Sequence, residues 1–399
     1  MWTILGLMLW AGPCSPQEDV RLTIEGLERD IAAVPVVYPI GVRVDPDTQE
    51  LLDENSQPVP FQTDGAGEST HLHWIARDLV AGQPKTYRLA PRRSGPRPAL
   101  PEKLVHFREE NGEVEVLLSE TPFTRVHLAD DAPRPYLFPV EAFGHRVTRS
   151  WPMEKGVAGE NEDHPHHKSI WFSYGDIDGV DYWADPSGDA PRGRILHREL
   201  LDRTEGPVYA RLVSRQEWVA PDDSVRLEGV EELRFYLTPE NPIIDLTMTL
   251  TAVTQSVRIG DTKEGMMAIR VHPGLKAQSG GTLSNSGNLV GERALWGKPA
   301  RWCDMSGKIG EDALGITLMD HPESFRHPTR WHARGYGLLA ANPFGLSYFV
   351  DKSQDGGITL EKGESVRFRY RILIHRGDAA GGAVDQMYRL WARPSVRRE

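Results

Sequence analysis

A histidine-rich segment holds the residue types best suited to chemistry. His164, His166 and His167 lie within four consecutive positions. Neutral imidazole can ligate a divalent metal, and a pKa near neutrality also suits histidine for general acid and base catalysis. Because Pro165 disfavours a helix at His164, we expect an extended chain here. His164 and His166 would then point to one side of the chain, and His167 to the other.

Carboxylates and aromatic rings follow in the same segment. Asp178, Asp181 and Trp183 lie within 20 residues of the histidines. Aromatic rings stack on the apolar face of a sugar, and carboxylates accept hydrogen bonds from its hydroxyls. The segment therefore predicts a sugar site, a metal site or an acid–base pair. A loop of surface histidines over a buried aromatic strand is the alternative.

A second segment, 263–272, combines opposite charges. Glu264 and Arg270 are separated by an even number of residues, so a strand would place both side chains on one face. A carboxylate and a guanidinium on one face can position a hydroxylated or anionic substrate. The alternative is a row of surface salt bridges.

A third segment, 320–344, is again rich in histidine. It contains His321, His327 and His332, followed by Arg334 and Tyr336. Two of these histidines precede proline, which favours extended backbone. We expect His332 to take part in catalysis or metal binding, and Arg334 and Tyr336 to contact the substrate. Ordinary loop residues are the alternative.

The elements that must position these residues are mainly strands. The chain has 38 glycines and 30 prolines in 399 residues, which favours many turns over long helices. Residues 243–251 alternate between apolar and polar side chains, as in a half-buried antiparallel strand. Further strands are expected at 208–219, 227–237 and 365–374, with shorter ones at 20–24, 86–89, 114–119, 123–128, 315–318 and 346–350. We therefore predict a mainly β fold, a large antiparallel β-sandwich.

One amphipathic helix is expected near the C-terminus. Val384, Met387, Tyr388 and Trp391 have the spacing of one helical face. The proline-rich stretch 91–101 reads as an extended connector. We therefore predict an N-terminal β module with its connector at 17–100 and a large β-sandwich domain, which carries the candidate site, at 101–399.

Charge and the N-terminus bear on partners and location. The net charge is −11, which argues against a nucleic-acid partner. Residues 2–12 are apolar, with the length of a signal-peptide core, so residues 1–16 are a candidate signal peptide; a misassigned start or a cytoplasmic extension is the alternative. The protein would be secreted or periplasmic with a working leader and cytoplasmic without one. No stretch has membrane-spanning length, so we expect no stable membrane insertion.

Several long motifs resemble a known family. Residues 163–183, 263–271, 300–307 and 327–345 are similar to a bacterial family of unknown function labelled PmoA-like, or "methane oxygenase PmoA". Lys168 and Ser169 stand where that family usually has Arg and Gly, which weakens any role for position 168. The membrane subunit of that name needs several membrane spans, and their absence here argues against methane oxygenation.

A more distant resemblance is to galactose-mutarotase-like carbohydrate-active β-sandwiches. This resemblance implies a supersandwich-like fold, with histidines and a carboxylate on the concave face of a large antiparallel sheet. It is an analogy between folds, and the chemistry must be argued from the site.

Three functions remain open. The first is an enzyme that hydrolyses, eliminates or epimerises a small-molecule or glycan substrate derived from a sugar. Its catalytic residues would be His164, His167, Glu264 and His332, and its substrate-binding residues His166, Asp178, Asp181, Trp183, Arg270, Arg334 and Tyr336. The second is a metal-dependent enzyme with a divalent metal at His164, His166 and His332. The third is a non-catalytic carbohydrate-binding or envelope protein.

Overall fold

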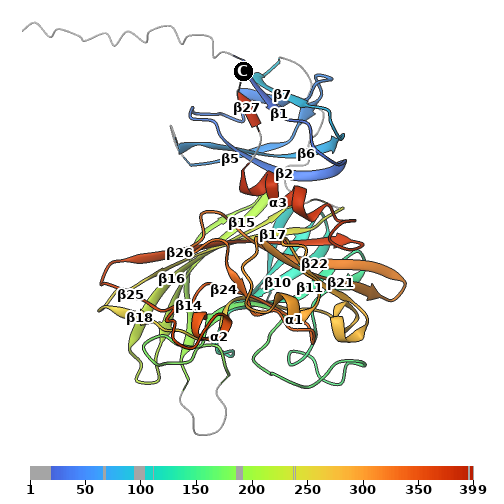
Figure 1. Cartoon of the computed structure of the whole chain (residues 1–399). Coiled ribbons are helices and arrows are strands. Elements are labelled where there is room, and N and C mark those ends of the chain that lie inside the picture. Colours follow the sequence, from blue (N-terminus) through green and yellow to red (C-terminus); the bar gives the residue numbers. More distant parts are fainter. Residues whose placement is uncertain are drawn as a thin grey trace, which may run out of the picture.

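The chain folds into a smaller β body stacked on a larger one, as Figure 1 shows. The computed structural model describes residues 19–65, 69–93, 104–110, 112–185, 192–236, 238, 240–393 and 396–398. Strands account for 51% of the structure and helices for 7%, so the prediction of a mainly antiparallel β fold is confirmed. The candidate leader and most of the proline-rich connector lie outside the described residues. No helix in the described ranges is long and apolar enough to cross a membrane.

The smaller body contains two sheets. The five-stranded sheet has the order β27 (Val396–Arg398), β1 (Val20–Ile24), β7 (Lys85–Pro91), β3 (Gln49–Leu52) and β4 (Pro58–Val59). The three-stranded sheet has the order β2 (Ile31–Pro39), β6 (His71–Leu79) and β5 (Phe61–Asp64). The C-terminal strand β27 therefore returns to the smaller body, where it pairs with β1.

The larger body is built on two long antiparallel sheets. One has the order β14 (Arg194–Thr204), β15 (Tyr209–Val219), β16 (Val225–Tyr236), β17 (Ile243–Thr251), β26 (Ser365–Arg376), β22 (Asp312–Asp320), β21 (Trp302–Ile309) and β20 (Thr282–Asn285). The other has the order β23 (Arg330–Trp331), β24 (Leu338–Asn342), β19 (Gly265–Arg270), β13 (Ile170–Tyr174), β11 (Tyr136–Ala142), β10 (Thr121–His127), β9 (Glu113–Leu118) and β8 (Val105–Glu110), with β12 (His145–Arg146) beside β11. A separate pair joins β18 (Val257–Ile259) to β25 (Ile358–Leu360). Below, the two long sheets are called the eight-stranded and the nine-stranded sheet.

The main core lies between these two sheets. On β17, Ile244, Leu246, Met248 and Leu250 point into it, as the period-two pattern of the sequence predicts. Alternate residues of the nine-stranded sheet, such as Ile170 and Phe172 on β13, enter the same core from the opposite side. Because side chains alternate along each strand, each sheet also has an outer face whose side chains do not belong to the main core.

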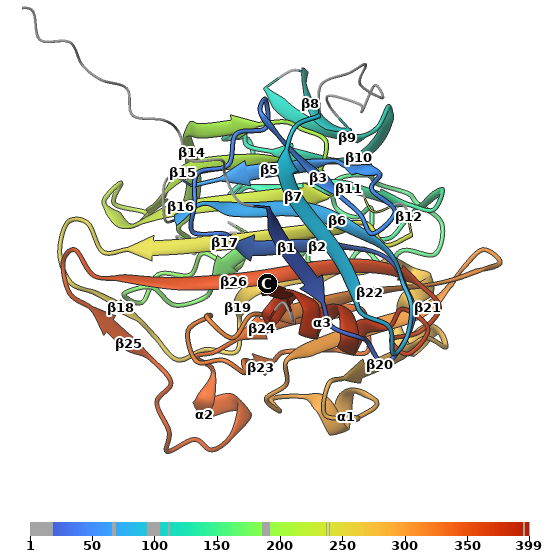
Figure 2. The ribbon, with the colours of Figure 1, turned by 90° about the horizontal axis from the view of Figure 1, so that it is seen from above.

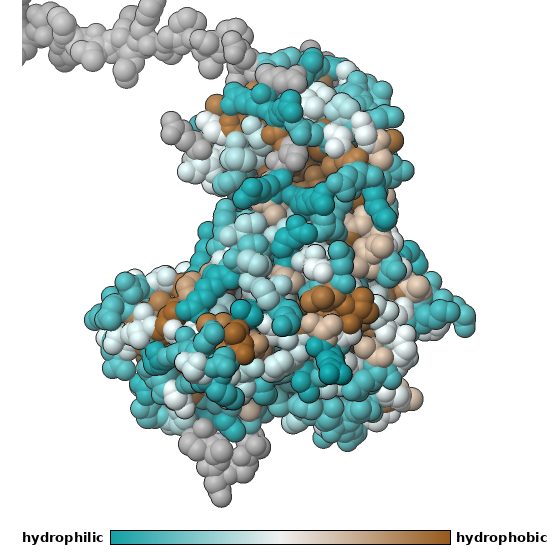
Figure 3. Space-filling model, viewed as in Figure 1, coloured by the Kyte–Doolittle hydropathy of each residue, from teal (hydrophilic) through white to brown (hydrophobic). Residues whose placement is uncertain are grey.

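The smaller body covers the outer face of the eight-stranded sheet. Tyr209, Tyr236 and Leu373 of that sheet join the core of the smaller body. The predicted C-terminal helix is present as α3 (Val384–Ala392) and lies between the two bodies in Figure 1, with Val384 and Met387 fully buried. Seen from above, β7 crosses the strands of the larger body (Figure 2). The molecule narrows where the bodies meet (Figure 3).

Short helices occupy places where strands or loops were expected. The described residues also contain α1 (Glu292–Leu295), α2 (Leu346–Phe349) and the 3-10 turns η2 (Pro273–Leu275) and η3 (Ala277–Ser279). The prediction of a strand at 346–350 is therefore wrong. The Asn342 side chain accepts hydrogen bonds from the Phe344 and Gly345 amides, which turns the chain away from the sheet, and Asp261 binds the Ser347 amide and hydroxyl.

A buried carboxyl in the main core makes stability depend on pH. Glu231 points inward from β16, is 8% exposed and accepts one hydrogen bond, from Gln216. Burial raises the pKa of this carboxyl to about 7. A raised pKa means that the folded chain holds the proton more tightly than the unfolded chain. The free energy of unfolding therefore falls as the pH rises from about 4.5 to about 7.

We expect Glu231→Gln to remove this pH dependence. The variant should be more stable than the wild type above pH 7, by up to about 3 kcal/mol in urea unfolding. Glu232→Gln is the matched control, because Glu232 lies next along the strand and pairs with Arg211 and Arg234. Burial raises the pKa of Glu232, but the two arginines outweigh it and lower the pKa overall. The control should therefore destabilise the protein at neutral pH, and a same-sign result for both variants would contradict the argument.

Candidate functional site

The three segments that the sequence singled out meet on the outer face of the nine-stranded sheet. Trp171 on β13 is paired in register with Ala268 on β19, which is paired with Ala340 on β24. The His332 amide donates to the Ala340 carbonyl at 2.8 Å, which continues the row. Because these side chains point away from the main core, two alanines form a low floor between Trp171 and His332. This face lies opposite the sheet that carries the smaller body.

The histidine-rich segment forms a tight turn on this face. The His167 amide donates to the His164 carbonyl at 2.9 Å, and His164 has a φ of 44°. The expectation of an extended chain with His167 on the opposite side is therefore wrong, because the turn brings the three rings together. His164 stacks on His167 at 4.7 Å between ring centroids, and His166 meets His167 edge-on at 4.4 Å.

Two buried arginines hold this turn in place. Arg134 donates to the His166 carbonyl at 3.1 Å, and Arg149 donates to the carbonyls of His164 at 2.5 Å and His167 at 3.3 Å. Arg134 also pairs with Asp185 at 2.9 Å. The His164 carbonyl also accepts the His167 amide, and the His166 carbonyl accepts the Lys168 amide at 3.2 Å, so the arginines add a second, charged donor to each. The arginines thus fix the backbone from which the imidazoles project.

Asp163 joins this turn to the neighbouring strand. Its Oδ1 accepts from Arg149 at 2.7 Å and from Arg270 of β19 at 2.9 Å, and its Oδ2 lies 3.3 Å from Nδ1 of His164. Burial raises the pKa of the Asp163 carboxyl, but Arg270, Arg149 and His164 together bring it below its usual value. The His164 side chain is 41% exposed. Asp163 therefore orients an accessible imidazole through its Nδ1 atom.

His167 is a donor in this arrangement. Arg270 donates to its Nδ1 at 3.0 Å, and a guanidinium has no acceptor, so the proton of neutral His167 is on Nε2. Burial, together with His166 and Arg270, lowers the pKa of His167 well below its usual value. A neutral ring protonated at Nε2 can donate a hydrogen bond from that atom and has no free lone pair with which to act as a base.

His332 has the opposite tautomer. Its Nδ1 donates to the Lys263 carbonyl at 2.9 Å, so the Nε2 lone pair of the neutral ring is free. Burial lowers the pKa of His332 to about 3, and Lys263 lowers it further while the carbonyl bond opposes the shift. Glu264 lies beside the ring, with Oε2 at 3.9 Å from Nδ1, and pairs with Lys263. This pair lies at the far end of the alanine floor from the histidine turn.

Tyr336 packs against the histidine turn and two arginines. Its ring stacks on His164 at 5.2 Å, and the guanidinium of Arg270 lies 4.5 Å above its centroid. Burial raises the pKa of Tyr336 to about 12, against the effect of nearby arginines, so the phenol stays protonated. Arg334 lies 5.9 Å from the same ring and pairs with Glu292 at 3.2 Å. Both arginines therefore border the site.

His166 and Trp183 also belong to the site. The His166 ring meets Trp183 at 6.4 Å, and Trp183 packs on Trp171 at 5.0 Å beneath the histidines. Both tryptophans are at most 2% exposed. Burial and the nearby Arg134 lower the pKa of His166 to about 4, so this ring is neutral at physiological pH.

Asp178 and Asp181 stabilise local turns rather than this group of side chains. Asp181 accepts from the amides of Trp183 at 2.8 Å and Ala184 at 3.0 Å and pairs with Arg192. Asp178 accepts from the Arg258 amide at 2.8 Å. The geometry therefore gives no support for the prediction that they bind substrate, because their oxygens already serve the backbone.

The third histidine segment divides between the two sheets. His332 reaches the site, whereas His321 packs edge-on against Trp391 of α3 at 4.7 Å. His327 pairs with the buried Asp320 at 2.8 Å and lies 3.4 Å from the Tyr388 hydroxyl, also on α3. Clustering along the sequence therefore overestimated the number of histidines at the site.

No group of three or more His, Cys, Asp or Glu side chains in the described ranges is arranged to hold a metal ion. The set His164, His166 and His332 does not form such a group. The divalent metal considered from the sequence therefore enters no step below.

Comparison with known proteins identifies the family. A profile described as a family of unknown function (DUF6807) matches residues 113–389, which is more than half of the chain. The chain belongs to the DUF6807 family. That match carries no PmoA-like name, and no curated protein matches the sequence.

Solved structures share only distant likeness with this DUF6807 protein. One is a glycosyl hydrolase family 38 protein from Enterococcus faecalis, with 10% identity, a TM-score of 0.42 and coverage of 96% of this chain and 48% of that one. Another is a galactose mutarotase-like protein from Lactobacillus casei, with 12% identity, a TM-score of 0.32 and coverage of 68% and 100%. The chain thus spans about half the length of the first protein. At these values, the activity must be argued from the site itself.

The sequence did not reveal the charged supports of the DUF6807 site. Asp163 was visible only as a carboxylate next to the histidines. Arg134 and Arg149 precede the turn in the sequence without any motif, and their role depends on carbonyls that come together only after folding. A buried arginine with carbonyl partners leaves no periodic signal.

We expect Asp163→Asn to destabilise the protein at neutral pH by on the order of 3 kcal/mol, because it leaves two buried guanidinium groups without their carboxylate. The pKa of Asp163 is lowered in the folded chain. Its contribution to the free energy of unfolding is therefore present above the pKa of the unfolded chain, near 4, and is lost as the pH falls below that value. The difference between variant and wild type should therefore shrink on acidification, in urea unfolding measured across pH. Glu323→Gln is the control, since its carboxylate pairs with Arg369 while 62% exposed and should change stability by less than about 1 kcal/mol. Equal effects of the two substitutions would refute the role given to Asp163.

Proposed function

We propose that this protein is a carbohydrate-active enzyme that transfers protons on a sugar-derived substrate. The observation that supports the proposal is the placement of two different proton-transfer groups at opposite ends of one floor. One end has the exposed His164 with its Asp163 partner, and the other has Glu264 beside His332. Both carboxylates act electrostatically on Tyr336.

The accessible rings suit a hydroxylated ring substrate. His164 and Tyr336 are stacked and partly exposed, whereas Trp171 and Trp183 are buried beneath the histidine turn. We infer that the tryptophans keep the imidazoles rigid and that the substrate contacts His164, His166 and Tyr336 directly. The neutral imidazoles and the phenol then offer donors and acceptors to sugar hydroxyls.

The proton-transfer step follows from the tautomers. His164 accepts a proton from the substrate at Nε2, and Asp163 stabilises the imidazolium through Nδ1. Glu264 takes up a proton from solvent and donates it to the substrate at the other end of the floor, while His164 releases the abstracted proton to solvent, so the number of protons is conserved. His167 donates a hydrogen bond from Nε2 to a substrate oxygen, and Arg270 holds that tautomer. Hydrolysis, elimination and epimerisation each need such a base and acid, so the arrangement suits all three.

A non-catalytic carbohydrate-binding protein is the second candidate. It is favoured by the low pKa values of His166 and His332, about 4 and about 3, because permanently neutral imidazoles bind hydroxyls well but exchange protons poorly near neutral pH. Export through residues 1–16, which would place either protein outside the cytoplasm, stays a prediction.

Turnover of a glycan panel separates the two candidates. We expect His164→Ala and Glu264→Gln each to lower kcat on any accepted substrate by about 10²- to 10⁴-fold, while substrate binding measured by calorimetry changes far less. His145→Ala is the matched control, because His145 is also half-buried and paired with a carboxylate, Asp312, but lies outside the site. Wild-type turnover in both site variants would rule out the enzyme proposal, and binding without any turnover would favour the second candidate.

A further inference from the structure

A cavity outside the histidine site lies at the junction of the two bodies. It has a volume of about 500 Å³, within the range of ordinary small-ligand pockets. Its walls come from the loop between β1 and β2, from β20 and the turn that follows it, from Trp302 on β21 and from the first turn of α3. It is on the side of the eight-stranded sheet, away from the nine-stranded sheet that carries the histidines.

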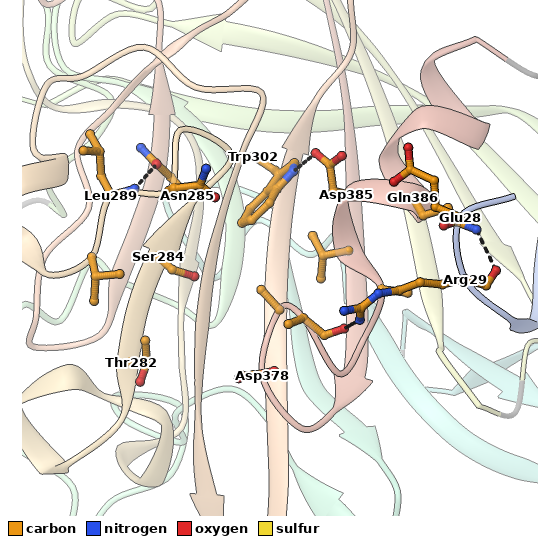
Figure 4. Close-up of a pocket in the computed structure, with 16 residues that line it drawn as sticks. Glu28, Arg29, Thr282, Ser284, Asn285, Leu289, Trp302, Asp378, Asp385 and Gln386 are labelled. Atoms are coloured by element: carbon orange, nitrogen blue, oxygen red, sulfur yellow. Dashed lines mark hydrogen bonds between the residues drawn. The ribbon is translucent and has the colours of Figure 1, made fainter. Parts of the chain in front are cut away.

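One wall is polar and uncharged. Thr282 and Ser284 project from β20 (Figure 4). Asn288 lies in the following turn, where its amide donates to the Asn285 carbonyl. Within the part of the chain that the structure describes, the hydroxyls of Thr282 and Ser284 make no hydrogen bond. They therefore remain available to donate to, and accept from, a ligand.

The remaining lining is apolar. Trp302 lies between the polar wall and α3 in Figure 4, and Leu289, Val384 and the alanines before α3 complete the surface. Val290, at the rim, is 63% exposed, the highest value among the large apolar side chains described. A ligand with a hydroxylated edge and an apolar face would satisfy both kinds of wall.

Carboxylates outnumber cations in the lining of the cavity, where Glu28, Asp378 and Asp385 face Arg29. Asp385 binds Arg301 at 2.8 Å and the indole N–H of Trp302 at 3.3 Å, and Glu28 pairs with Arg389 at 2.6 Å. Asp378 accepts a hydrogen bond from the Gly381 amide at 2.8 Å, and Arg29 donates to the Ala380 carbonyl. Because the lining has three carboxylates and one guanidinium, it disfavours an anionic ligand.

We propose that this junction cavity is a second binding site, for a neutral saccharide, separate from the histidine site. The saccharide presents its hydroxyls to Thr282, Ser284 and Asn288 and its apolar face to Leu289, Val290 and the α3 side. Because the walls come from both bodies, the bound sugar would link them. The proposal does not depend on catalysis at the nine-stranded sheet.

The test titrates the full chain with maltotriose, cellotriose and mannotriose, and with trigalacturonate as the anionic comparison. Binding is followed by saturation-transfer NMR and calorimetry. We expect at least one neutral trisaccharide to bind at up to millimolar concentration, and trigalacturonate to bind at least tenfold more weakly. Ala380→Trp, which fills the cavity from an exposed position, should raise Kd at least tenfold. Ser284→Val, which removes one hydroxyl and suits a strand, should raise it about threefold.

His164→Ala distinguishes the two sites. It should leave Kd for the bound trisaccharide unchanged, even where it abolishes turnover. The proposal is overturned if no neutral trisaccharide binds, if trigalacturonate binds as well as the neutral sugars, or if both cavity variants bind normally. It is also overturned if His164→Ala, rather than Ala380→Trp, weakens binding. Melting curves of the two cavity variants show whether each remains folded. If one variant does not fold, the other is enough for the binding test.

Discussion

The ion cluster of Asp163 with Arg149 and Arg270 is the interaction on which the histidine site depends. One carboxylate oxygen joins the histidine turn to β19 and to the chain preceding the turn. Each guanidinium then makes a second contact that matters for chemistry: Arg149 with the turn carbonyls, and Arg270 with Nδ1 of His167. A single carboxylate therefore positions the two arginines that fix the backbone of the histidine turn and the tautomer of His167.

This arrangement also explains why His166 and His167 are neutral. Burying a guanidinium is costly, by several kcal/mol for each ion, unless a carboxylate and carbonyls compensate it. Three buried arginines, Arg134, Arg149 and Arg270, lie close to the imidazoles and, together with burial, disfavour a further positive charge. Among the described histidines of the site, His164 is the one that combines an exposed side chain, at 41%, with a nearby carboxylate, Asp163. The supports of the site thus leave one imidazole accessible and bury the others.

Some strands were predictable because they carry their own pattern, and the histidine turn was not. Residues 243–251 show their buried face by alternation alone, and Val384 to Trp391 show theirs by helical spacing. The direction of the three imidazoles in residues 164–167 instead depends on a positive φ at His164 and on two distant arginines. The shared position of residues 264, 270 and 332 depends on strand order, which periodicity does not encode. The short helix at 346–349 is fixed by Asn342 and Asp261, through side-chain bonds that a run of apolar residues does not show.

The two outer faces of the sandwich impose different demands on the sequence. The eight-stranded sheet is covered by the smaller body and α3, so its outer residues, such as Tyr209 and Leu373, extend a second apolar core. On the nine-stranded sheet, the outward-facing Ala268 of β19 and Ala340 of β24 are fully buried beside Trp171, Trp183 and Leu338, and Tyr336 packs against this small cluster. Small side chains at these two positions let the aromatic rings around the histidine turn pack close to the sheet. The same antiparallel alternation therefore produces a structural face on one side and a chemically equipped face on the other.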